Sequence, residues 1–478
     1  MTENLKQQAL QGTKWAAIEK FSLQIIQFVL GIILARLLTP DDYGTIGMLT
    51  VFIAISNVFI DSGFSSALIR KIERTEEDYS TVFVTNFAIS FIFAGILVLI
   101  APLVAKFYDM PILCPVLRVQ SISLVLYALM AVQTTKLTAE VNFKALAKAS
   151  LISSPLSGVI GIGLAYIGWG VWALVAQNLL SIASKFACIM LQCHWFPKIR
   201  FSKKSFDELF GFGKNMLGAS LLSAIYFNLD SIIIGKFFTP ASLGNYSRGT
   251  QIARLPVDNI NGVLNTVTYP ILAKLQNETE KLLQAYRKYI RLTSLCIFFC
   301  CMLMAALAKP LVLLLLTDKW ADAIIYLQIF SFAIMLDHLS VINLNLIKIK
   351  GRSDLILKLE IIKRIISFTI LFAAIPFGVL GICISKIIYS IISTYINTYY
   401  NGKLFNLGFL AQFKDYSKYL GLSVLCCLPA FVISFLNLPY MVTLIIGASI
   451  AGFLYWLILR KDDVMIEIFS MVKSKLCR

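Results

Sequence analysis

Residues Ala35–Gly44 read A-R-L-L-T-P-D-D-Y-G, and Gly235–Gly244 read G-K-F-F-T-P-A-S-L-G. A basic residue, two apolar residues, Thr-Pro and a later glycine recur in the same order about 200 residues apart. Fainter echoes follow at nearly the same offset: Leu117–Ser121 with Leu327–Ser331, Phe143–Lys148 with Ser353–Lys358, and Gly170–Leu174 with Gly378–Ile382. Several matches in one order along the chain indicate two duplicated halves.

Both halves are strongly hydrophobic. Hydrophobic residues make up 58% of the chain, the mean hydropathy is +0.79, and only 14% of the residues are charged. A transmembrane helix needs about 20 apolar residues, and the chain offers about fourteen such stretches. They are 14–36, 43–68, 80–105, 114–135, 149–167, 170–193, 212–237, 243–273, 286–316, 322–347, 356–376, 378–400, 417–436 and 439–459. The first has no cleavage pattern after it, so we expect it to be retained.

The repeat sets the architecture. Its period covers roughly six helices, so both halves enter the membrane in the same direction and form a parallel repeat. We therefore predict an all-α polytopic membrane protein with two parallel six-helix lobes, residues 1–205 and 206–405. A terminal two-helix hairpin and a cytoplasmic tail, residues 406–478, complete the chain.

The distribution of charge sets the orientation. The 43 Lys and Arg outnumber the 26 Asp and Glu and give a net charge of +17. Most basic residues fall in the N-terminus, in alternate loops and in the C-terminus, and basic loops stay cytoplasmic. We predict that both termini are cytoplasmic and that the turns around Pro40, Pro240 and Asn437 are outside. Topology explains the charge, so no nucleic-acid partner is required, whereas contact with membrane lipid is expected.

The sequence offers little for catalysis. The ten Cys lie mostly inside apolar stretches, and neither they nor the two His have the spacing of a metal site. No phosphate-binding loop, dinucleotide fingerprint or nucleophile elbow is present. A membrane-embedded polymerase or ligase would need a long catalytic loop, which the short connections do not provide. We predict a protein that is not an enzyme and needs no metal or cofactor.

The densest set of polar residues lies in the stretch 243–273. Its members follow helical spacing and share one face: Gln251, Arg254, Asp258, Asn261, Asn265 and Thr268. Lipid cannot solvate such a face, so it must line water or a polar neighbour. Pro256 is expected to kink this helix and free backbone carbonyls. The alternative is an internal Arg254–Asp258 salt bridge packed against other helices.

Other ionisable residues are weaker candidates. Arg248 and Asp230 are predicted to lie at similar depth on neighbouring helices, where an ion pair would be as readily structural as functional. Lys386 lies deep in a predicted helix and is a further cavity candidate. Three local arrangements are also predicted: a proton relay of Asp337 and His338, an ion pair of Glu360 and Arg364, and, at Asp61, either a helix cap or an ion pair with Arg70 or Lys71.

The chain resembles a known family in its signature stretches. Gly31-x-x-Leu-Ala-Arg-Leu-Leu-Thr-Pro-Asp-Asp-Tyr-Gly44 and Asp61–Ile69 look like the N-terminal signature of Wzx-type oligosaccharide flippases, and Asn228–Phe238 and Leu243–Gly249 agree with it. These flippases belong to the multidrug/oligosaccharidyl-lipid/polysaccharide exporter superfamily. The branch that this chain is most similar to is the colanic-acid and teichuronic-acid exporter type.

The resemblance implies alternating access in the bacterial inner membrane, with a polyprenyl-diphosphate-linked oligosaccharide as the substrate for surface polysaccharide synthesis. A polysaccharide polymerase is a candidate partner, and H⁺ or Na⁺ is a candidate driving ion. Arg254 is the first choice for contact with the diphosphate, because a cation at mid-depth lowers the cost of moving charge through hydrocarbon. The alternative is an ion-coupled multidrug or small-solute exporter of the same superfamily, which the apolar residues at the matching first-lobe positions disfavour.

Overall fold

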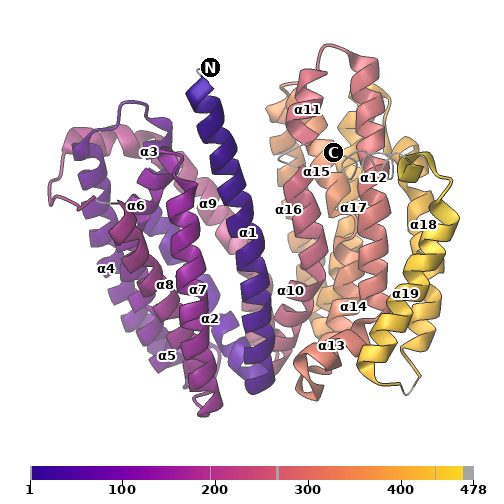
Figure 1. Ribbon diagram of the computed structural model, residues 1–478. Coiled ribbons are helices and arrows are strands. Elements are labelled where there is room, and N and C mark those ends of the chain that lie inside the picture. Colours follow the sequence, from indigo (N-terminus) through magenta and orange to yellow (C-terminus); the bar gives the residue numbers. More distant parts are fainter. Residues whose placement is uncertain (1–2, 194, 265–267, 437, 467–478) are drawn as a thin grey trace. The chain divides into compact units, whose positions relative to one another are not determined.

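The computed structural model describes residues 3–193, 195–264, 268–436 and 438–466, and every regular element in these ranges is a helix (Figure 1). The first part of the chain forms α1 (Glu3–Leu37), α2 (Pro40–Asp61), α3 (Phe64–Arg70), α4 (Glu76–Phe107), α5 (Leu113–Gln120), α6 (Ile122–Ala139), α7 (Phe143–Tyr166), α8 (Val171–Cys193) and α9 (Lys203–Phe237). The second part forms α10 (Pro240–Val263), α11 (Tyr269–Lys274), α12 (Thr279–Ala306), α13 (Ala308–Leu316), α14 (Ala323–Ile334), α15 (Asp337–Ile349), α16 (Ser353–Ala374), α17 (Gly378–Phe405), α18 (Phe409–Ile433) and α19 (Tyr440–Leu459), with short 3₁₀ turns η2 (Asp318–Trp320) and η3 (Ile375–Phe377).

The helices confirm the prediction of an all-α polytopic membrane protein. Twelve segments of the described residues are long and apolar enough to cross a membrane, and one of them, Asp354–Phe405, is 52 residues long and holds both α16 and α17. The long helix α10 is not among these segments, because polar residues interrupt its apolar face. The chain folds as two compact units, Met1–Gly244 and Asn245–Arg478. Helix α9 packs on α2 and α3 of the first unit, and the lobe boundary after residue 205 stays a prediction.

Several predicted spans are not single helices. The stretch 43–68 divides into α2 and α3, 114–135 into α5 and α6, 286–316 into α12 and α13, and 322–347 into α14 and α15. Hydropathy reports composition and not backbone conformation, so it missed these breaks. The clearest break follows α2, where Ser62 and Gly63 both adopt left-handed conformations, with φ of 45° and 74°.

The residues of this break explain a signature stretch. Asp61 ends α2, and its carboxylate accepts hydrogen bonds from the backbone and the hydroxyl of Ser65, which confirms its predicted role as a cap. A side chain at Gly63 would place its Cβ 2.5 Å from the carbonyl oxygen of Gly213 in α9. Glycine is therefore required here both for its φ and for the close approach of two backbones.

The two copies of the opening phrase pack on each other. Each forms a helix-to-helix junction, α1 to α2 and α9 to α10, in which threonine precedes a proline at the first helical position. A Cβ on Gly44 would lie 1.8 Å from the carbonyl oxygen of Pro240, and a Cβ on Gly244 would lie 2.0 Å from that of Pro40. The contact is thus reciprocal, and small residues allow the backbones to touch. The two Thr-Pro turns of the repeat therefore form equivalent junctions.

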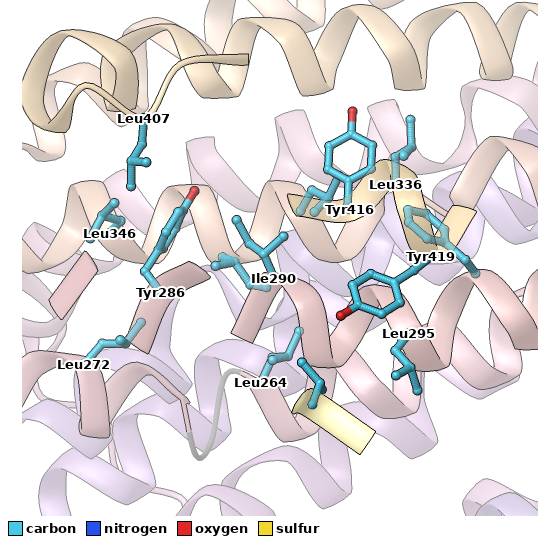
Figure 2. Packing of buried hydrophobic residues seen from close by; sticks show 14 of the residues in the cluster. Leu264, Leu272, Tyr286, Ile290, Leu295, Leu336, Leu346, Leu407, Tyr416 and Tyr419 are labelled. Atoms are coloured by element: carbon cyan, nitrogen blue, oxygen red, sulfur yellow. The ribbon is translucent and has the colours of Figure 1, made fainter. Parts of the chain in front are cut away.

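The core of the second unit is built around α12. Tyr286, Ile290 and Phe298 lie about one turn or two apart on one face of α12 and are fully buried. They pack with residues of α15 and α18, among them Leu346 and Tyr416 (Figure 2). This packing holds the three helices together.

Candidate functional site

Helix α10 carries four of the six residues of the predicted polar face, whereas Thr268 lies beyond the end of α10 and is buried. Gln251, Arg254 and Asp258 are exposed, and Asn261 is partly buried. Asn265 lies outside the described residues. The ion pairs of the described residues do not include Arg254 with Asp258, although both side chains lie on the same face. A charged and exposed face on a helix of an apolar bundle must meet water or a polar neighbour, because lipid cannot solvate it.

A second carboxylate of unit 2, that of Asp337, interacts with the charges of this face. Asp337 is the first residue of α15 and follows the break from α14, inside the apolar segment Ala323–Ile349. The charges of Arg254, Asp258 and Lys363 all act on its carboxylate. Helices α10, α15 and α16 therefore contribute to one charged cluster within unit 2.

Helix α16 supplies the rest of the cluster through local ion pairs. Lys363 is buried, with 5% of its surface exposed, and its Nζ contacts a carboxylate oxygen of Glu360. The second oxygen of Glu360 lies 3.7 Å from Arg364, which confirms the ion pair predicted from their spacing. Sequence reasoning missed Lys363, although its place between two residues of a predicted ion pair was a usable signal.

Arg248 has contacts of its own in the second unit. Its Nη1 donates to the side-chain oxygen of Gln251 at 2.7 Å, and its guanidinium lies 5.9 Å from the ring centre of Trp320. Asp230 is partly buried in α9 of the first unit, so the predicted Asp230–Arg248 pair stays a prediction. Lys386 is partly buried in α17. The location of Lys386 in a cavity stays a prediction.

Pro256 lies inside α10, and the helix runs past it to Val263. Proline has no N–H, so the carbonyl oxygen of Ile252 receives no helical hydrogen bond from that position. The carbonyl oxygen of Leu255 accepts instead from the Asn259 side chain at 2.8 Å. The kink and the freed carbonyls expected at Pro256 stay predictions.

His338 has a structural role. The side chain is fully buried, its Nε2 lies 2.9 Å from the hydroxyl of Ser294, and its Nδ1 lies 2.9 Å from the carbonyl oxygen of Met335. Both ring nitrogens are therefore committed to fixed partners. This geometry does not favour the relay that the sequence predicts between His338 and Asp337.

A buried polar network joins four helices of unit 2. The side-chain oxygen of Asn343 in α15 accepts from the hydroxyl of Tyr286 and from the Gln412 amide, both at 2.9 Å, and from Asn401. Asn343 donates in return to Gln412 at 3.0 Å. Buried amides of this kind are costly unless bonded, and here they fix α12, α15, α17 and α18. The network was not predicted, because its members lie far apart in sequence.

A charged, exposed face on one helix of a largely apolar helical chain is typical of a polytopic membrane transporter. The chain belongs to the family described as polysaccharide biosynthesis protein, whose family model matches residues 33–325. This confirms the resemblance stated from the signature stretches.

Individual relatives cover nearly the whole chain. The teichuronic acid biosynthesis protein TuaB of Bacillus subtilis (strain 168) is 24% identical over 483 residues, which cover 99% of each chain. The lipopolysaccharide biosynthesis protein WzxC of Escherichia coli (strain K12) is 22% identical over 440 residues, 90% of this chain and 88% of the relative. The inward closed structure of the lipid II flippase MurJ has a TM-score of 0.76 at 14% identity, over 93% of this chain and 98% of that chain. This last likeness shows the fold.

Proposed function

We propose that this protein is a flippase that moves a polyprenyl-diphosphate-linked oligosaccharide across the bacterial inner membrane for surface polysaccharide synthesis. The observation that carries the proposal is the exposed face of α10, with Arg254 at its centre, in a chain of the polysaccharide biosynthesis family. Relatives named for teichuronic acid and lipopolysaccharide synthesis support this class of substrate.

The chemistry of such a substrate fits the residues of the face. A diphosphate is too costly to move through hydrocarbon alone, and an arginine bonds phosphate oxygens in a planar, charge-assisted geometry. Gln251 and Asn261 offer amides to sugar hydroxyls, while the prenyl tail remains in lipid. Transport then requires no reaction, only two states that bind the head group from opposite sides. The protein is a transporter rather than an enzyme in this proposal.

The proposed orientation has both termini in the cytoplasm. Asp41 and Thr239, both exposed beside the repeated Thr-Pro turns, would then face outward. We expect Asp41→Cys and Thr239→Cys in a cysteine-free background to react with an impermeant maleimide on intact cells. Labelling that occurs only after permeabilisation would reverse the orientation.

The proposal also includes an ion, H⁺ or Na⁺, that drives transport. Asp258 and Asp337 are carboxylates within a charged cluster, and such groups can take up H⁺ or bind Na⁺. The same carboxylates favour the alternative function, an ion-coupled exporter of small cationic solutes. Proteoliposomes separate the two functions, because the flippase moves a fluorescent lipid-linked oligosaccharide between leaflets and the exporter moves a small cation instead.

Arg254 is the decisive residue to change. Arg254→Ala should reduce the flipping rate by at least about tenfold, because one charge-assisted contact to phosphate is worth roughly 1.5–3 kcal/mol. Arg254→Lys should keep part of the rate, since it retains the charge without the planar fork. Arg352→Ala is the matched control, because Arg352 is an exposed arginine of unit 2 bonded to Asp354.

A double change distinguishes a ligand contact from a structural one. If Arg254 serves only to balance Asp258, then Arg254→Ala combined with Asp258→Ala should restore both the melting temperature and the flipping rate. We expect the double variant to fold normally and to remain inactive. Full recovery would assign the two residues a structural role and remove Arg254 from the site.

A further inference from the structure

One face of α12 carries an unusual concentration of positive charge. Arg287 and Arg291 are one helical turn apart, and both bond the same carboxylate, Asp415 of α18. Arg287 donates from Nε and Nη2 at 2.8 and 2.9 Å, and Arg291 donates from Nε and Nη2 at 3.0 and 2.6 Å. Neighbouring like charges on a helix are destabilising, so one carboxylate for two guanidinium groups leaves an excess of positive charge.

The geometry leaves part of that charge accessible. The side chain of Asp415 is 1% exposed, whereas the side chains of Arg287 and Arg291 are each 44% exposed. A guanidinium has five N–H donors, and the bonds to Asp415 use only those of Nε and Nη2. The buried carboxylate thus fixes the planes of two arginines, and among the described residues their Nη1 donors remain for another acceptor.

These arginines line a pocket. Its volume is about 350 Å³, within the range of ligand-binding pockets. The lining residues are Gln284, Arg287, Lys288, Arg291, Asp463 and Val464. With three cations and one exposed carboxylate, the lining favours an anion.

The pocket lies where the apolar part of the helices ends. Helices α12, α18 and α19 pack side by side in unit 2 (Figure 1). Asp415 is near the start of α18, and Asp463 follows the end of α19. Charged residues that border the uncharged stretches of three neighbouring helices mark the level of the lipid head groups.

We propose that this pocket binds the phosphate of an anionic phospholipid whose head group carries hydroxyls, phosphatidylglycerol being the chemical type. The Nη1 donors of Arg287 and Arg291 hold the phosphodiester, in the planar geometry that arginine gives to phosphate. Asp463, at the same wall, accepts from a head-group hydroxyl and repels dianionic phosphates. Anionic leaflets concentrate such lipids at basic segments. The site lies outside the charged face of α10 and does not depend on which substrate the protein moves.

Lipid binding by the purified full-length protein tests the proposal. In native mass spectrometry, short-chain phosphatidylglycerol should be retained about tenfold more strongly than phosphatidylcholine. Arg291→Gln should lose most of this preference while the Arg287–Asp415 bonds keep the buried carboxylate neutralised. Arg352→Gln, an exposed arginine outside the pocket, should retain it. Inorganic phosphate should compete weakly, because the hydroxyl contact is missing.

Folding must be controlled in the same samples. If Arg291→Gln lowers the melting temperature strongly, Lys288→Gln is the second variant, because it changes the lining and leaves both bonds to Asp415 in place. Equal retention of the two lipids by the wild-type protein would overturn the proposal. The proposal also fails if well-folded pocket variants keep the preference, and strong competition by inorganic phosphate would make this a site for free anions.

Discussion

The reciprocal contact of the repeated turns makes a sharp prediction at Gly44. In Gly44→Ala the new Cβ would lie 1.8 Å from the carbonyl oxygen of Pro240 and 2.5 Å from the carbonyl carbon. Carbon and oxygen atoms in such contacts normally keep about 3.3 Å or more, so the two backbones must separate by roughly 1.5 Å. The obstacle is backbone, and no change of side-chain rotamer can relieve it.

The expected cost follows from that displacement. Overpacking of a tight contact typically costs about 1–3 kcal/mol, against a gain of about 0.5–1 kcal/mol for replacing glycine within a helix. We therefore expect a net loss of stability, seen as a lower melting temperature of the purified protein. Gly244→Ala should behave alike, since its Cβ would lie 2.0 Å from the carbonyl oxygen of Pro40.

Gly95 provides the matched control. It lies inside α4, and a Cβ there would meet no atom within 4 Å. Gly95→Ala should leave the melting temperature unchanged or raise it slightly, because it removes only the entropic cost of glycine. If Gly44→Ala melts at or above the temperature of Gly95→Ala, the reciprocal contact has no energetic role and this reasoning is refuted.

Two further predictions concern unit 2. Tyr286→Phe removes the hydroxyl that donates to Asn343. It should therefore lower the free energy of unfolding by about 1 kcal/mol, and an unchanged melting temperature would argue against the network. Burial would raise the pKa of Asp462, but the bonds from Lys418 and from the Val464 N–H outweigh it, and the pKa is lowered. Its contribution to stability is thus present above about pH 4 and is lost as the pH falls through the lowered folded-state pKa. Asp462→Asn should melt below the wild-type protein at neutral pH, and the gap should close on acidification. A difference in melting temperature that does not change with pH would contradict the stabilising role of the Asp462 carboxylate.

The sequence predicts which segments form helices better than it predicts which helices contact each other. The length of each apolar stretch located nearly every membrane segment, because the composition of a segment reflects the lipid around it. The repeated Thr-Pro phrase predicted equivalent junctions, and the structure adds that Gly44 and Gly244 are there for contact. That pairing could not be derived, since a local pattern does not say which distant backbone approaches it.

Charged residues show the same difference between contacts within one helix, which the sequence predicts, and contacts between helices, which it does not. Helical spacing placed Arg254 and Asp258 on one face of α10, and this could be derived because both residues lie on one helix. The carboxylate shared by Arg287 and Arg291 could not, because Asp415 is on another helix. Two arginines one turn apart do, however, signal that an anion must be near.

The charge balance of the cluster bears on the proposed function. The α10 face and Asp337 bring two carboxylates to Arg254, and α16 brings Lys363 and Arg364 with Glu360. Positive and negative groups are therefore equal in number around a site proposed to take an anionic substrate. A diphosphate can gain from Arg254 only where the arginine does not already satisfy a carboxylate, and the structure has no Arg254–Asp258 ion pair among the described residues. In such a balanced cluster the proposed contact with Arg254 binds the anion, and the nearby carboxylates keep that binding weak enough for release.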